Sequence, residues 1–259
     1  MKFKKSMELL FFGTGTSKGI PVIGCDHPVC LSNDPRDNRM RSSVLIRKNN
    51  KNYLIDCGPD FRMQMLHNKI SKVEAILYTH EHADHTAGLD DIRPITQKYG
   101  DMPIYTYKRV MANLAHRFDY IFTTENKYPS APGVIPNTIE NKPFLIDNLE
   151  VIPIQVMHGK LPIFGYRIDS VCYITDASFI SDSEKEKLYN LDILVINALR
   201  LKEHPTHFNL EKALNLIAEV KPKRAYITHI SHKLGFHKEI EKQLPNNVFL
   251  AYDGLKVKI

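Results

Sequence analysis

Four side chains that commonly bind metals fall close together in the segment Thr79-His80-Glu81-His82-Ala83-Asp84-His85. The segment follows an apolar run, Val73 to Tyr78, that has the composition of a buried strand. Alternation along the chain sends the first two histidines the same way, while the aspartate and the third histidine fall where the chain turns into a helix. Such groups beside a buried strand are costly unless a cation satisfies them. The candidate metal ligands are His80, His82, Asp84 and His85.

The pattern H-x-H-x-D-H after a hydrophobic strand resembles the signature of the metallo-β-lactamase superfamily of hydrolases. The resemblance implies an α+β fold, a four-layer αββα sandwich, with further ligands at the ends of later strands. The sequence supplies three residues that fit: His158 after Leu149 to Met157, Asp176 after Val171 to Thr175, and His229 after Arg224 to Thr228.

Carried over from this family, the ligands form a dinuclear centre. Metal one is held by His80, His82 and His158, and metal two by Asp84, His85 and His229, with Asp176 bridging the two. The resemblance implies zinc or manganese ions that activate a water as hydroxide for attack on a phosphodiester. In the same family the aspartate of a D-x-G element, here Asp56, supports the ligand loop by hydrogen bonding.

A second group of ligands lies in Gly24-Cys25-Asp26-His27-Pro28-Val29-Cys30. Two thiolates and an imidazole make most of a tetrahedral zinc site, whereas the alternative is a loop with two unrelated cysteines. Cys57 and Cys172 stand in apolar, strand-like surroundings, which predicts inert core thiols.

The loop that begins Gly13-Thr14-Gly15-Thr16-Ser17 and continues to this group resembles the phosphodiesterase branch, the phosphoribosyl 1,2-cyclic phosphate phosphodiesterases. In that family three cysteines and a histidine hold a structural zinc, and the histidine stands three residues after the last active-site histidine. His232 has that position here, and His27 replaces the middle cysteine. The resemblance implies a structural zinc on Cys25, His27, Cys30 and His232.

Two histidines precede the helix expected at Asn209 to Val220. His207 stands where the phosphodiesterase branch has its catalytic histidine, so we expect it to be the general acid that protonates the leaving oxygen. The alternative is His204, three residues earlier.

A chain of 259 residues with 43% hydrophobic content fits a single hydrolase domain, 1–259. The apolar runs are too short for a signal peptide or a membrane span, and four cysteines are too few for a disulfide scaffold. We therefore expect a cytoplasmic protein with no membrane partner. The net charge of +6 favours anionic partners, but the basic residues are scattered, so nucleic acid ranks below a small substrate.

Local patterns predict helices at Asp60 to Lys69, Thr86 to Tyr99 and Asp182 to Asn190. The segment Thr123 to Asn137 has loop composition and is long for a connection. A lid, a contact of a homodimer and a plain surface excursion are the three interpretations of that segment.

These observations favour a dinuclear metal-dependent phosphodiesterase that acts on a small phosphodiester, linear or cyclic. Two other hypotheses stay open. One is an endoribonuclease that processes tRNA 3′ ends, which shares the H-x-H-x-D-H pattern. The other is a metal-binding module without catalysis on the same fold.

Overall fold

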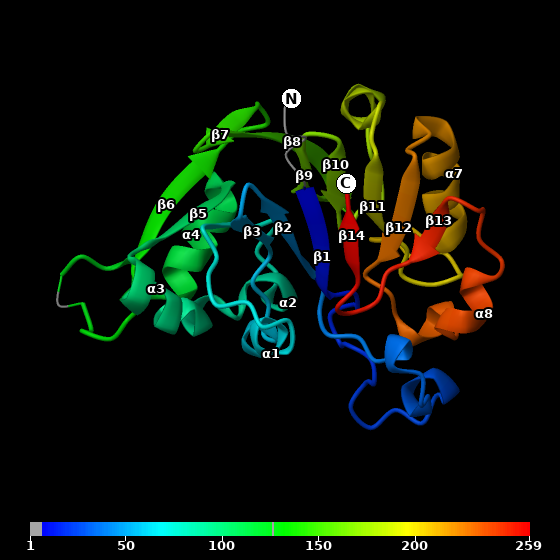
Figure 1. The fold of residues 1–259 in the computed structure, drawn as a ribbon, viewed down its shortest axis with the longest axis horizontal. Helices are drawn as coiled ribbons and strands as arrows, with labels where there is room; N and C mark the ends of the chain where they lie inside the picture. The colour runs from blue at the N-terminus through cyan, green and yellow to red at the C-terminus, as the bar shows by residue number, and fades with distance from the viewer. Residues whose placement is uncertain (1–6, 126) are drawn as a thin grey trace. The chain divides into compact units, whose positions relative to one another are not determined.

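The computed structural model describes residues 7–125 and 127–259 of the chain. The described residues divide into two compact units (Figure 1). The first takes residues 7–12, 43–125, 127–140 and 254–259, and the second takes residues 13–42 and 141–253. Each unit is built on its own seven-stranded sheet. The single domain expected from the sequence stays a prediction.

The first sheet combines an antiparallel hairpin with parallel strands. Its strands, in spatial order, are β14 (Lys256–Lys258), β1 (Met7–Gly13), β2 (Ser43–Lys48), β3 (Lys51–Ile55), β4 (Ala75–Leu77), β5 (Met102–Tyr107) and β6 (Val134–Ile139). The β2–β3 hairpin turns at Asn49 and Asn50, whose φ angles of 54° and 62° are those that a two-residue type I′ turn requires. From β3 to β6 the strands run parallel, so their carboxyl ends share one edge.

Short helices cover the core of the first unit. They are α1 (Phe61–His67), α2 (Ala83–Thr86), the 3₁₀ helix η3 (Leu89–Ile92), α3 (Arg93–Tyr99), α4 (Lys108–Arg117) and α5 (Asp119–Phe122). The single helix predicted over Thr86 to Tyr99 is therefore divided into pieces. The break after α2 includes Gly88, where a Cβ would collide with the Gly58 carbonyl and only glycine fits.

The second sheet places four parallel strands beside an antiparallel meander. In spatial order its strands are β13 (Val248–Leu250), β12 (Arg224–Thr228), β11 (Ile193–Asn197), β10 (Val171–Ile174), β9 (Leu161–Ile168), β8 (Leu149–His158) and β7 (Phe144–Ile146). The strands β10 to β13 are parallel, and their residues are almost entirely buried. Side chains that follow these strands meet at one edge, which is where α/β sheets place functional groups.

The helices of the second unit are η1 (Pro28–Leu31), η2 (Pro35–Asp37), α6 (Asp182–Lys185), η4 (Glu186–Leu188), α7 (Leu210–Val220), η5 (His232–Leu234) and α8 (His237–Glu241). The longest, α7, begins at an Asn209 cap whose side chain accepts from the Lys212 N–H. It ends at Lys221, which is left-handed with φ 49°. Its apolar side chains belong to the core of the second unit, and the helix contacts β11.

The segment predicted as a loop over Thr123 to Asn137 is partly a strand, since β6 takes residues from Val134 onward and pairs with β5. Pro136 misled the prediction, yet a proline is tolerated at a sheet edge, where β6 lies. Residue 126 lies outside the described residues. Cys57 and Cys172 are fully buried, as expected. Among the described residues, no helix has the length and apolar character to cross a membrane.

Candidate metal centre

The ligand loop of the first unit leaves β4 and enters α2 within a few residues. It holds its four candidate ligands as two pairs. The Nε2 atom of His80 lies 3.0 Å from Nδ1 of His82, and Nε2 of His85 lies 3.1 Å from Oδ2 of Asp84. Two pairs of converging nitrogen and oxygen donors fit borderline or hard divalent cations.

Asp56 directly follows β3 and binds the ring nitrogen of His85 that does not face Asp84. Its Oδ2 lies 2.8 Å from Nδ1 of His85, and its two oxygens also accept bonds from the N–H and hydroxyl of Thr79. Burial raises the pKa of the Asp56 carboxyl, against the opposing effect of His85. With Nδ1–H directed to Asp56, His85 presents Nε2 as a metal donor, which agrees with the supporting role expected for this aspartate.

Two arginines from α4 clamp the ligand loop, and sequence reasoning missed both. Arg109 binds the Glu81 carboxylate through Nε at 2.8 Å and through its second terminal nitrogen at 3.1 Å. Arg117 donates to the Glu81 carbonyl at 3.1 Å and to the Thr86 hydroxyl at 2.8 Å. The Thr86 hydroxyl in turn donates to the His82 carbonyl at 2.9 Å. The clamp turns Glu81, which lies between two ligand histidines, toward α4.

In the second unit, the Asp176 carboxylate lies between two imidazoles. Its Oδ1 is 2.9 Å from Nδ1 of His229, and its Oδ2 is 3.2 Å from Nε2 of His207. Asp176 and His229 have φ angles of 56° and 53°, a left-handed backbone that costs energy in residues other than glycine. Strain of this kind just beyond a strand is common at functional sites, and here the two strained residues are in contact through their side chains.

His158 is fixed at the end of β8 by two carbonyl groups. Its Nδ1 lies 2.9 Å from Asp176 O and 2.8 Å from Thr206 O, so Nδ1 carries the proton and Nε2 is the ring atom with the lone pair that a metal needs. One candidate ligand atom from each of His158, Asp176 and His207 lies within 4.8 Å of the others. This part of the site therefore holds a compact group of nitrogen and oxygen donors.

The loop after β1 also reaches these groups. The Thr16 hydroxyl is 3.1 Å from Nε2 of His229, so both ring nitrogens of His229 have contacts in the second unit. This contact brings the loop of small residues to one of the candidate metal ligands. A metal bound by His229 would replace one of the two contacts.

His207 differs from expectation in its protonation. Burial lowers its pKa to about 4, which outweighs the opposing effect of the Asp176 carboxylate. A general acid at neutral pH would be an imidazolium, whereas a pKa this low favours the neutral imidazole, with Nε2–H directed to Asp176. His204 lies beside it, with 3.2 Å between the two Nδ1 atoms, and burial lowers the pKa of His204 as well.

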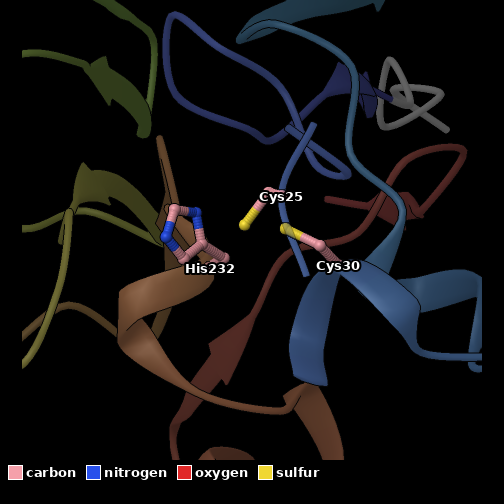
Figure 2. Close-up of side chains that lie close together, drawn as sticks. All are labelled: Cys25, Cys30 and His232. Carbon is pink, nitrogen blue, oxygen red and sulfur yellow. The ribbon is translucent and has the colours of Figure 1, made fainter. Parts of the chain in front are cut away.

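The cysteine group of the second unit is compact. Figure 2 shows the sulfurs of Cys25 and Cys30 and the ring of His232 directed toward one another, and their ligand atoms lie within 4.8 Å. Nδ1 of His232 is buried and makes no hydrogen bond among the described residues. Burial is the main cause that raises the pKa of the Cys30 thiol, and the adjacent Cys25 adds to it. Two thiols and an imidazole are a donor set that suits zinc.

His27 lies outside this group of three. Its Nδ1 accepts the Val29 N–H at 3.2 Å and so caps η1, while its ring centroid is 4.9 Å from that of His232. The expected fourth ligand is therefore turned to a capping role in this structure, with only its Nε2 left to reach a metal.

Comparison with known proteins identifies the family. The sequence profile of the beta-lactamase superfamily domain matches residues 51–230. The chain belongs to the beta-lactamase superfamily. It is a hydrolase domain with the α+β metallo-β-lactamase fold, and the fold implies divalent metal ions at its His and Asp clusters.

Two curated relatives align with almost all of the chain. An octanoyltransferase of Porphyromonas gingivalis is 39% identical over 256 residues, which are 98% of this chain and 52% of the relative. The chain thus spans about half the length of that protein. A ribonuclease Z of Bacillus subtilis is 26% identical over 324 residues, covering 98% of this chain and 99% of the relative.

Among solved structures, a new diphosphatase from the PhnP family is 42% identical, with a TM-score of 0.91 and coverage of 97% of both chains. The Zn²⁺-bound PqqB of Methylobacterium extorquens is 17% identical, with a TM-score of 0.79, and covers 96% of this chain and 99% of its own. At that identity the second likeness shows the fold alone.

Proposed function

We propose that this superfamily hydrolase is a dinuclear metal-dependent phosphodiesterase. The observation that carries the proposal is the pairing of donors in one loop, His80 with His82 and Asp84 with His85. Each pair can supply two ligands to a different ion, whereas a single structural ion needs one closed set of four ligands. The His–Asp group of the second unit supplies further donors of the same kind.

The proposed ligand assignment follows the sequence prediction. One ion takes His80, His82 and His158, the other takes Asp84, His85 and His229, and Asp176 serves both. When bound there, zinc or manganese would supply a water of lowered pKa as nucleophile and would neutralise phosphate charge. A separate zinc is proposed at Cys25, Cys30 and His232, with His27 as the predicted fourth ligand.

The chain's own residues prepare these ligands. Asp56 holds His85 with Nε2 outward, and two carbonyls do the same for His158. Arg109 removes the Glu81 carboxylate from the neighbourhood of the ligand histidines by a bidentate pair. Ligands that are already oriented lose little conformational freedom on binding, which strengthens metal affinity.

His207 is proposed to donate from Nε2 to the leaving oxygen. In the resting site this N–H faces Asp176, 3.2 Å away, and a substrate oxygen would compete for it. Since the pKa of His207 is about 4, little imidazolium is present at neutral pH. A hydrogen bond from Nε2–H that stabilises the developing charge on the leaving oxygen is therefore the form of this role.

We propose a small phosphodiester, linear or cyclic, or a diphosphate as the substrate. The structural relative with 42% identity is a diphosphatase, and hydrolysis of either linkage needs the same nucleophile and charge neutralisation at phosphorus. The net charge of +6 favours such anions. The ribonuclease Z relatives support a second candidate, endonucleolytic cleavage of precursor tRNA.

A substrate panel tests the proposal and separates the two candidates. Purified protein loaded with Zn²⁺ or Mn²⁺ is assayed on cyclic phosphodiesters, linear phosphodiesters, diphosphates and a precursor tRNA. We expect metal-dependent hydrolysis of small substrates with much weaker tRNA cleavage. Efficient tRNA cleavage with inert small substrates would replace the proposal by the second candidate. Inactivity on the whole panel would overturn both.

A further inference from the structure

Asn197 is the last residue of β11, and its side chain is not a usual metal ligand. Its amide forms two hydrogen bonds with the backbone of Ala177, the residue after Asp176. Its Oδ1 accepts a hydrogen bond from the Ala177 N–H at 2.8 Å, and its Nδ2 donates to the Ala177 carbonyl at 3.0 Å. Both residues are fully buried. An amide carries a donor and an acceptor side by side, which is what two bonds to one backbone residue require.

The same backbone residue also holds the loop of His207. The Phe208 N–H donates to the Ala177 carbonyl at 2.6 Å, and the Leu199 N–H donates to the Phe208 carbonyl at 3.0 Å. The Ala177 carbonyl thus accepts from both Asn197 and Phe208. Movement of Ala177 would shift Asp176 and His207 together.

The segment that follows Asn197 forms hydrogen bonds with the residues on either side of His229. Asn197 is paired with Thr228 in the parallel register of β11 and β12, and the Ala198 N–H donates to the Thr228 carbonyl at 3.1 Å. His229 comes immediately after Thr228. Two residues further on, the Ser231 N–H and hydroxyl donate to the Leu199 carbonyl at 3.0 and 2.7 Å.

We infer that Asn197 is a positioning residue for the metal centre, one that fixes Asp176 and His207 relative to His229. The inference rests on the proposed metal-binding function of these residues. β10 ends at Ile174, so Asp176 lies beyond the strand, and the two Asn197 bonds to Ala177 add to the backbone bonds that hold this segment. Asp176 has a left-handed φ of 56°, which a segment without such bonds would not keep.

The test measures metal binding directly, so that it does not depend on a substrate. Apo protein is titrated with Co²⁺ and Zn²⁺ in competition with a chromophoric chelator, for the wild type, Asn197→Ala and Asn197→Ser. We expect active-site affinity to fall by about 10- to 100-fold in both variants, as is typical when a partner that orients a ligand is lost. The Co²⁺–thiolate absorption of the Cys25–Cys30–His232 group should stay unchanged and serves as an internal reference.

The serine variant keeps a small polar group at this position, so it is the variant to use if the alanine variant fails to fold. Its hydroxyl cannot reproduce both amide bonds to Ala177, so the loss of metal affinity is still expected. Val248→Ala is the matched control, since Val248 is buried in β13 of the same sheet and pairs with Ala225, near the start of β12 and not at the end that precedes His229. This control should lose stability while it keeps wild-type metal affinity. Equal losses of metal affinity in Val248→Ala, or wild-type affinity in Asn197→Ser, would overturn the inference. If wild-type protein hydrolyses no phosphodiester but Asn197→Ser still binds metal weakly, the proposed function fails while the positioning role stands.

Discussion

The Oδ2 atom of Asp56 lies 2.8 Å from the Nδ1 atom of His85, and both side chains are completely buried. In this pair the carboxylate accepts a bond from Nδ1–H, so His85 presents Nε2 on the side of Asp84. The choice of tautomer, and with it the ability of His85 to bind a metal, thus depends on an aspartate 29 residues earlier in the chain.

Asp56→Asn tests that dependence with almost no change in side-chain volume. An asparagine amide can turn its NH₂ toward Nδ1, which would move the ring proton to Nε2 and block the metal donor. We expect metal affinity and hydrolysis to fall by about 10- to 100-fold, with a cooperative unfolding transition retained. Calorimetric titration with Zn²⁺ gives the affinity, and Asp60→Asn, a change close in the sequence, is the control. Unchanged affinity in Asp56→Asn would show that the pair does not set the tautomer.

Substitution of His207 tests its role at the leaving oxygen. His207→Ala should lower kcat by about 10²- to 10⁴-fold for a substrate with a poor alkoxide leaving group. The loss should shrink for p-nitrophenolate, which departs without help. Equal losses on both substrates would indicate phosphate binding instead. A loss of bound metal would make His207 a ligand, a role that its position beside His158 and Asp176 permits. His204→Ala is the comparison, and we expect it to show no leaving-group dependence.

The cysteine group should contribute stability more than activity. Cys25→Ser and His232→Ala remove donors from a site that is proposed to bind zinc, so both should lose one zinc and lower Tm, with hydrolysis at low temperature largely kept. Elemental analysis and thermal unfolding measure the two effects. If neither variant loses zinc, this site does not exist.

His27→Ala distinguishes the zinc ligand that the sequence predicts from the helix cap that the structure shows. A fourth ligand would make this variant behave like His232→Ala, with loss of zinc. A helix cap would make it lose only about 0.5–2 kcal/mol of stability while zinc is kept. The bond from the Val29 N–H to His27 favours the second result.

Local patterns located the ligand loop and the buried strands, whereas the fold class came from the family resemblance that the ligand loop carries. H-x-H-x-D-H needs only the few residues around it, and buried parallel strands such as β11 and β12 have continuous apolar runs that are visible in the sequence. The family resemblance then pointed to Asp176 and His229, which the structure places 2.9 Å apart.

What the sequence could not reveal are interactions between distant residues. The contact from Arg109 to Glu81 spans 28 positions and that from Asn197 to Ala177 spans 20, and no spacing rule marks either. The lowered pKa of His207 comes from burial, which belongs to the folded state and not to the neighbouring residues in the chain. For the Arg109 contact, the one hint in the sequence is Glu81 itself, a carboxylate between two ligand histidines that needs a positively charged partner.

The central claim, two metal ions that serve hydrolysis at phosphorus, is tested most directly by counting metals and turnover together. Wild-type protein and Asp84→Ala are analysed for metal content, and both are assayed on bis(p-nitrophenyl) phosphate before chelation, after chelation and after Zn²⁺ or Mn²⁺ is restored. We predict that wild-type activity disappears with chelator and returns with metal, whereas Asp84→Ala, still cooperatively folded, holds less metal and is inactive throughout. Wild-type turnover in Asp84→Ala, or hydrolysis that persists in metal-free protein, would contradict the claim.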